Sequence, residues 1–135
     1  MPTSANHDIA QLPGLTAAQI TQLNSCGIST TFDLLRQGNS LPQRQQLSKQ
    51  LGTNIKYINK WTALANLARI PGVGCAYCGL LLHAGVSTPQ QLSSMTVQRL
   101  HPQLTRLQVQ LLNRADLAPS VGQVASWIEQ AKSMI

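Results

Sequence analysis

Residues 70–93 read IPGVGCAYCGLLLHAGVSTPQQLS and repeat residues 12–35, LPGLTAAQITQLNSCGISTTFDLL, at an offset of 58. Eight of the 24 aligned positions are identical, and three more exchange one aliphatic side chain for another. At ordinary residue frequencies chance gives about one or two identities in such an alignment. We therefore expect one helical domain, residues 1–135, that holds two units, the first near residues 4–52 and the second near residues 53–135.

Residues typical of helix ends recur along the chain. A Ser or Thr followed three residues later by Gln or Asp, the pattern of a capping box, begins at five positions: Thr16, Thr30, Ser40, Thr88 and Ser120. Glycine stands where helices are expected to stop, at Gly27, Gly38, Gly52 and Gly85. No window alternates long enough to be a strand. The sequence predicts an all-α fold, with helices near residues 4–11, 16–26, 30–37, 42–51, 54–69, 75–84, 88–94, 103–116 and 120–133 and a further turn over 96–101.

One of these helices has a clear apolar face. Tyr57, Trp61, Leu64 and Ala68 recur at i, i+4, i+7 and i+11, so they share one side of a helix. This spacing predicts that all four side chains are buried.

Each copy of the repeat begins with a tight turn. Glycine permits a sharp bend of the backbone, and an aliphatic residue in the middle of the turn fills the angle between two helices. In the first copy Thr replaces the last glycine. The turn pattern resembles the helix-hairpin-helix motif, and the eight turn residues are Pro13, Gly14, Leu15, Thr16, Pro71, Gly72, Val73 and Gly74.

The chain as a whole is similar to an uncharacterised bacterial family, a domain of unknown function built from tandem helix-hairpin-helix units. The resemblance covers nearly all 135 residues. Its main features are Asp33-Leu34-Leu35, Trp61 with Ala65, Leu67-Ala68-Arg69-Ile70, Leu80-Leu81, Ala84-Gly85-Val86 and the segment Val124-Ala125-Ser126-Trp127-Ile128-Glu129-Gln130-Ala131-Lys132. It implies tandem helix-hairpin-helix repeats and brings no activity with it.

The placement of charge bears on nucleic-acid binding. In helix-hairpin-helix domains that bind nucleic acids, backbone N–H groups hold a phosphate, usually beside a basic side chain. Here residues 9–32 and 70–98 contain no Lys, Arg, Asp or Glu. This pattern favours two uncharged hairpins that pack on each other about a pseudo-twofold axis. The candidate phosphate-contacting bases lie outside the turns: Lys49, Lys56, Lys60 and Arg69.

The cysteines suggest zinc, but the pattern is incomplete. Cys75 and Cys78 have the C-x2-C spacing of half a structural zinc site, with Cys26 and His83 as further candidate ligands. No second pair follows, and Cys78 takes the small buried position of the motif, where a free thiol packs well. A redox role for the pair lacks the expected βαβ context. We expect reduced cysteines, no metal and no cofactor.

No catalytic constellation is evident either. The four carboxylates, Asp8, Asp33, Asp116 and Glu129, are scattered, with no pair at helical spacing. His83 and His101 have no Asp nearby in sequence to orient them, and no Ser has a nucleophile-elbow setting. We expect a protein that is not an enzyme and has no small-molecule substrate.

Composition favours a binding function. Ten Lys and Arg against four Asp and Glu give a net charge of +6, yet only 10% of residues are charged and glutamine occurs sixteen times. Interfaces are depleted in charge at their cores. We expect an adaptor or assembly module that docks on another protein, the alternative being a non-sequence-specific binder of nucleic-acid phosphates. An odd cysteine count, and no visible signal sequence or membrane span, favour the cytoplasm.

Overall fold

The structure, a computed structural model, describes residues 4–112 and 118–134 and is helical throughout, as predicted. The elements are a 3-10 turn, η1 (Ile9–Gln11), and the helices α1 (Ala17–Ser25), α2 (Thr31–Gln37), α3 (Leu41–Leu51), α4 (Ile55–Ala68), α5 (Gly74–His83), α6 (Pro89–Ser93), α7 (Val97–Leu112) and α8 (Val121–Met134). Within these residues no strand is formed, and an isolated bridge joins Asp8 to Thr30.

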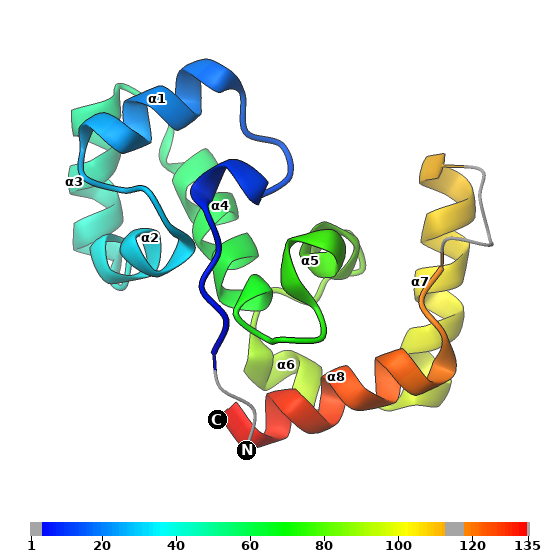
Figure 1. Cartoon of the computed structure of the whole chain (residues 1–135). Helices are drawn as coiled ribbons and strands as arrows, with labels where there is room; N and C mark the ends of the chain where they lie inside the picture. The colour runs from blue at the N-terminus through cyan, green and yellow to red at the C-terminus, as the bar shows by residue number, and fades with distance from the viewer. Residues whose placement is uncertain (1–3, 113–117, 135) are drawn as a thin grey trace.

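Helix α4 lies at the centre of the fold. It packs against α2 and α3 on one side and against α5 on the other (Figure 1). Helix α8 packs against α6 and α7, and α7 also contacts α5. The core between these helices consists of aliphatic side chains together with Trp61 and Trp127, both almost fully buried. Tyr57, expected to be buried beside Trp61, is instead 44% exposed, because the buried face of α4 begins at Ile58 and not at Tyr57.

The predicted capping boxes begin several helices. At Thr16, Thr30 and Ser40 the hydroxyl accepts the N–H three residues later, and that residue's side chain accepts the cap N–H in return. At Thr88 the hydroxyl also caps, but Gln91 Oε1 accepts from Ser87 N–H. These contacts satisfy first-turn amides that have no partner inside the helix. The sequence therefore predicted the starts of these helices correctly.

The two copies of the repeat share one local conformation at the end of their first long helix. Gly27 and Gly85 both have positive φ, +81° and +88°. In the first copy Ile28 N–H donates to the carbonyl of Leu23, and in the second Val86 N–H donates to that of Leu81, both at 3.0 Å. Glycine is needed here because other residues rarely adopt this left-handed conformation.

The correspondence continues into α4 and α8, with a different offset. Ile58, Trp61 and Ala65 in α4 are buried at i, i+3 and i+7, and Val124, Trp127 and Ala131 repeat this pattern 66 positions later. This offset is larger than 58 because more residues separate α6 from α8 than separate α2 from α4. In particular, α7 has 16 residues where α3 has 11. A comparison at one fixed offset therefore misses the last helix.

The prediction of a helix over residues 4–11 is wrong. Only Ile9–Gln11 form a 3-10 turn, with Asp8 as its N-cap. The residues before it use their backbone groups on distant segments: Ala5 N–H donates to Arg69 O, and His7 O accepts from Thr31 N–H. These tertiary hydrogen bonds require an extended chain, and so they prevent a local helix.

The helix predicted from residue 103 begins earlier. Helix α7 runs continuously from Val97 and contains Pro102. Proline removes one helical hydrogen bond, to the carbonyl of Gln98, and this residue is exposed to water. The cost is small enough for the buried side chains of Leu100 and Leu104 to hold the helix together across the proline. The predicted end of this helix, residues 113–116, lies outside the described residues.

Candidate functional site

The second turn, between α4 and α5, is closed by the protein itself. Gly72 N–H donates to Oε1 of Gln130 at 2.8 Å, and the N–H groups of Val73 and Gly74 both donate to Ile70 O at 3.0 Å. A Cβ at Gly72 would lie 2.9 Å from Cδ1 of Trp127. The N–H groups of Gly72, Val73 and Gly74 are therefore used in folding, and α8 contacts the turn, while Gly72 itself is exposed to solvent.

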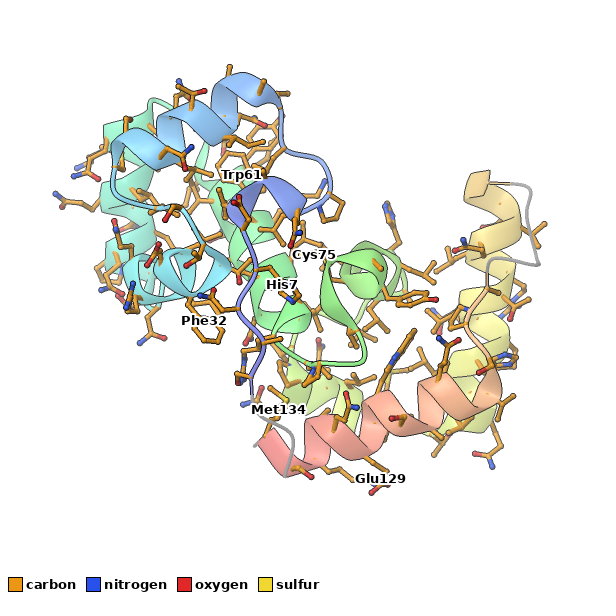
Figure 2. All side chains as sticks on the ribbon, viewed as in Figure 1. His7, Phe32, Trp61, Cys75, Glu129 and Met134 are labelled. Carbon is orange, nitrogen blue, oxygen red and sulfur yellow. The ribbon has the colours of Figure 1, made fainter. Side chains whose placement is uncertain are left out.

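The N-terminal segment closes the same region from another side. Nε2 of His7 lies 3.1 Å from the carbonyl oxygen of Ala68, in the last turn of α4. The ring of His7 also approaches Gly74, whose φ is +55°. Figure 2 shows His7 beside α4 and the start of α5. The α4–α5 turn thus has protein neighbours on two sides.

The first turn, before α1, is open. Gly14 has a φ of +83° and is exposed. The N–H groups of Gly14 and Leu15 have no acceptor among the described residues. The exposed residues Ala17 and Ala18 occupy the first two positions of α1, where amides lack intrahelical partners. The turn thus leaves N–H groups available at the positive end of a helix dipole.

A cation lies beside this open turn. Lys60 Nζ, from α4, is 3.8 Å from the position that a Cβ on Gly14 would take. Both residues line a cavity of about 200 Å³. Its other lining residues are Pro13, Leu64, Gly79, Leu82 and His83. The turn is uncharged in sequence, and tertiary packing brings to it Lys60, one of the candidate bases predicted from the sequence, together with His83.

The first turn is in contact with α5. The ring of Pro13, in the first turn, packs against Gly79 in α5, where a Cβ would lie 3.3 Å from its Cγ. The absence of a side chain at Gly79 therefore lets the first turn approach the second hairpin closely.

The other candidate bases have different environments. Lys49, in the last turn of α3, and Lys56, in α4, are exposed, and Lys56 Nζ lies 5.5 Å from the centre of the Tyr57 ring. Arg69 is half-buried and donates to Asn66 Oδ1 and Ser4 Oγ, and burial lowers the pKa of its guanidinium. Arg69 is thus engaged in holding the N-terminal segment, whereas the lysines face solvent.

A comparison with protein families places both turns in one conserved unit. The model described as Domain of unknown function (DUF4332) matches residues 13–134, from the first turn to the end of α8. The chain belongs to the DUF4332 family. The expectation of a family of unknown function is confirmed. No curated protein and no solved structure matches this DUF4332 chain.

Three of the four acids have partners among the described residues, and Asp116 lies outside those residues. Asp33 pairs with Arg36, and Glu129 pairs with Lys132 at 3.3 Å. Asp8 caps η1. In the part of the chain that the structure describes, no carboxylate lines the cavity at Gly14.

Two of the three cysteines of the DUF4332 domain, Cys75 and Cys78, lie in α5, and Cys26 is the C-cap of α1. Cys78 is fully buried, and burial raises the pKa of its thiol to about 12. Cys75 is half-buried, and burial raises its pKa as well. Over residues 4–112 and 118–134, no three His, Cys, Asp or Glu side chains come together as a metal site would require. Over the same residues no helix is both long and apolar enough to cross a bilayer.

Proposed function

We propose that this DUF4332 protein is a non-enzymatic binder of nucleic-acid backbone phosphates, built from tandem helix-hairpin-helix units. The observation that carries the proposal is the contrast between its two turns. The first turn presents unused N–H groups with Lys60 beside Gly14. In the second turn the N–H groups of Gly72, Val73 and Gly74 all have protein acceptors.

The chemistry of the first turn suits a phosphate. Backbone N–H groups at a helix N-terminus donate to phosphate oxygens, and the helix dipole favours the negative charge. An ammonium such as that of Lys60 adds a charge-assisted hydrogen bond. Contacts of this kind position a protein on nucleic acid without reading its sequence. Lys49 and Lys56, both exposed, would extend the contact to neighbouring phosphates.

The two turns contact corresponding helices, but different side chains lie beside their glycines. Each turn meets a helix that carries a buried tryptophan, α4 at the first turn and α8 at the second. Lys60 of α4 lies beside Gly14, whereas Gln130 and Trp127 of α8 lie beside Gly72. This correspondence supports tandem units in which one turn binds a ligand and the other packs.

The test is the salt dependence of binding to a fluorescently labelled DNA duplex, followed by anisotropy. Neutralised phosphates release counterions, so the logarithm of affinity falls linearly with the logarithm of salt concentration. Lys60→Ala is expected to lower this slope by about 1. Lys132→Ala is the matched control, because it also removes one lysine but from α8, where Lys132 pairs with Glu129.

Two results would contradict the proposal. One is the absence of duplex binding by the wild type even at low salt. The other is an equal change of slope in Lys60→Ala and Lys132→Ala, because net charge alone would then account for binding.

A second candidate, the adaptor that docks on a protein, is favoured by a neutral surface on α3. A shallow depression of about 410 Å³ is lined by four glutamines with Pro42 and Leu47. The glutamines are Gln37, Gln43, Gln46 and Gln50. Uncharged polar surfaces of this kind suit protein interfaces, whose cores are depleted in charge. The affinity of this α3 surface for a protein partner should therefore change little with salt concentration.

The adaptor function is tested by native pull-down and mass spectrometry. A protein captured at high salt by the wild type and by Lys60→Ala, but lost with Gln46→Lys, would support it. Retention by Gln46→Lys would show that the α3 surface is not the docking site.

A further inference from the structure

We infer that a polar groove between α3, α4 and the start of α6 binds a small molecule that carries an oxyanion, either a phosphate ester or a carboxylate. This inference rests on residues other than those of the open turn, and it stands independently of the proposed nucleic-acid function. The groove has a volume of about 330 Å³, at the lower end of the range for small-molecule sites.

One wall of the groove is a stripe on α4. Asn59, Thr62, Ala63 and Asn66 stand at i, i+3, i+4 and i+7, so they follow one face of the helix. The opposite wall comes from the end of α2 and from Arg44 of α3, and the far end is formed by residues 87 and 88. Both halves of the chain therefore contribute to the groove.

Arg44 is held in place by neutral partners. Its Nε donates to Asn59 Oδ1 and its Nη1 donates to Gly38 O, both at 2.8 Å. These bonds fix the guanidinium plane and leave Nη2 without an acceptor among the described residues. No carboxylate lines the groove, so the charge of Arg44 has no counterion there. Arginine in a fixed orientation is well suited to a carboxylate or a phosphate.

The two asparagines are oriented as donors. Asn59 Oδ1 accepts from Arg44, and Asn66 Oδ1 accepts from Nε of Arg69 at 2.7 Å. The acceptor atom of each amide is thus used by an arginine, which leaves its NH2 group for a ligand. Thr88 Oγ1 accepts from Gln91 N–H, so its O–H is also free to donate. The groove therefore offers hydrogen-bond donors and one positive charge.

Gly38 allows this arrangement. A Cβ at this position would lie 3.1 Å from both Leu34 O and Thr62 Oγ1. Its absence lets the end of α2 approach α4 closely enough for Gly38 O to anchor Arg44 beside Asn59. The donors are consequently positioned before any ligand arrives, which reduces the entropy lost on binding.

The experiment is a titration of the ¹⁵N-labelled full chain with inorganic phosphate and, separately, with succinate. The signals to follow are the side-chain NH2 groups of Asn59 and Asn66 and the Nε–H of Arg44. We expect at least one of the two probes to shift these signals along saturable curves.

Asn→Asp variants separate a specific site from general charge. Asn59→Asp and Asn66→Asp keep the oxygen that accepts from each arginine, but replace the NH2 donor with a negatively charged oxygen. We expect each to weaken binding by about tenfold or more. Asn54→Asp is the control, because it makes the same charge change in α4 at an N-cap where Asp serves as well as Asn. It should leave the affinity unchanged.

Three outcomes would overturn the inference. The first is the absence of saturable shifts with either probe. The second is equal weakening by Asn54→Asp and by the groove variants, which would show nonspecific charge attraction. The third is displacement of the probe from these signals by a DNA duplex, which would assign the groove to a nucleic-acid surface. Failure of duplex binding alone would leave the groove inference intact.

Discussion

The backbone N–H of Gly72 donates to Oε1 of Gln130 at 2.8 Å, and this bond joins the α4–α5 turn to α8. Trp127 lies against the same glycine and packs on Tyr77, with ring centres 4.8 Å apart and ring planes tilted by 46°. The last helix thus contacts the second turn and takes up the Gly72 N–H. The corresponding glycine of the first copy, Gly14, has Lys60 as its neighbour instead.

Gly72→Ala is expected to destabilise the fold by about 1–3 kcal/mol, the usual cost of extra volume in a packed contact. The added Cβ would lie 2.9 Å from both Trp127 Cδ1 and Gln130 Oε1. The measurement is urea unfolding followed by tryptophan fluorescence. Gly122→Ala is the control, because its Cβ would meet nothing closer than 3.9 Å, and it should be neutral or stabilising. Equal midpoints for Gly72→Ala and the wild type would show that α8 does not seal the turn.

Cys78 should make stability fall at alkaline pH. Its pKa rises from 9.0 to about 12 on folding, so above pH 9 the unfolded chain loses this proton while the folded chain keeps it. The free energy of unfolding should then fall as pH rises from 9 towards 12, with a slope of up to about 1.4 kcal/mol per pH unit from this group. Chemical denaturation at several pH values measures the slope, which Cys78→Ala should reduce. Parallel curves for the two proteins would contradict the prediction.

Asp33 should contribute to stability mainly above its unfolded pKa. The N–H of Ser29, with further hydrogen bonds from Ser29 Oγ and Thr30, holds the pKa of the Asp33 carboxyl below 3.8. Stability from this group is therefore present above pH 3.8 and is lost as the pH falls through the lower folded value. In urea unfolding, Asp33→Asn should be less stable than the wild type at about pH 6, and the difference should shrink in acid.

Glu129→Gln is a control for this acid effect. It removes a carboxylate that also pairs with a basic residue three positions later, Lys132, but that accepts no backbone N–H among the described residues. A pH dependence in Asp33→Asn no different from that in Glu129→Gln would contradict a specific role for Asp33.

Lys56 and Lys60 should act together in nucleic-acid binding. Both are exposed on α4, and Lys60 lies beside Gly14, so changing both to Ala should lower the salt slope of duplex binding by about 2 and leave the fold intact. Anisotropy at several salt concentrations measures the slope, and circular dichroism checks the fold. Duplex binding that survives this double change but is abolished by Gly74→Glu in a folded protein would place the phosphate site at the second turn.

Much of the secondary structure was determined by the sequence, because its signals are local. A Ser or Thr hydroxyl caps the residue three positions on, as at Thr30 and Ser40, and glycine ends helices where φ becomes positive, as at Gly27 and Gly85. The burial of Trp61 and Cys78 also followed from spacing. All these interactions join residues within about two turns of a helix, and so they can be read from the chain directly.

The tertiary structure alone decided which turn is open. Both turns are uncharged in sequence, yet α4 brings Lys60 to Gly14 and α8 brings Gln130 to Gly72. It also decided that residues 5–8 are extended, because their backbone groups bond to segments far along the chain. Contacts of this kind depend on how helices pack rather than on local preference. Two turns that share a Pro-Gly pair, but differ in their last residue, Thr16 and Gly74, therefore acquire different surroundings.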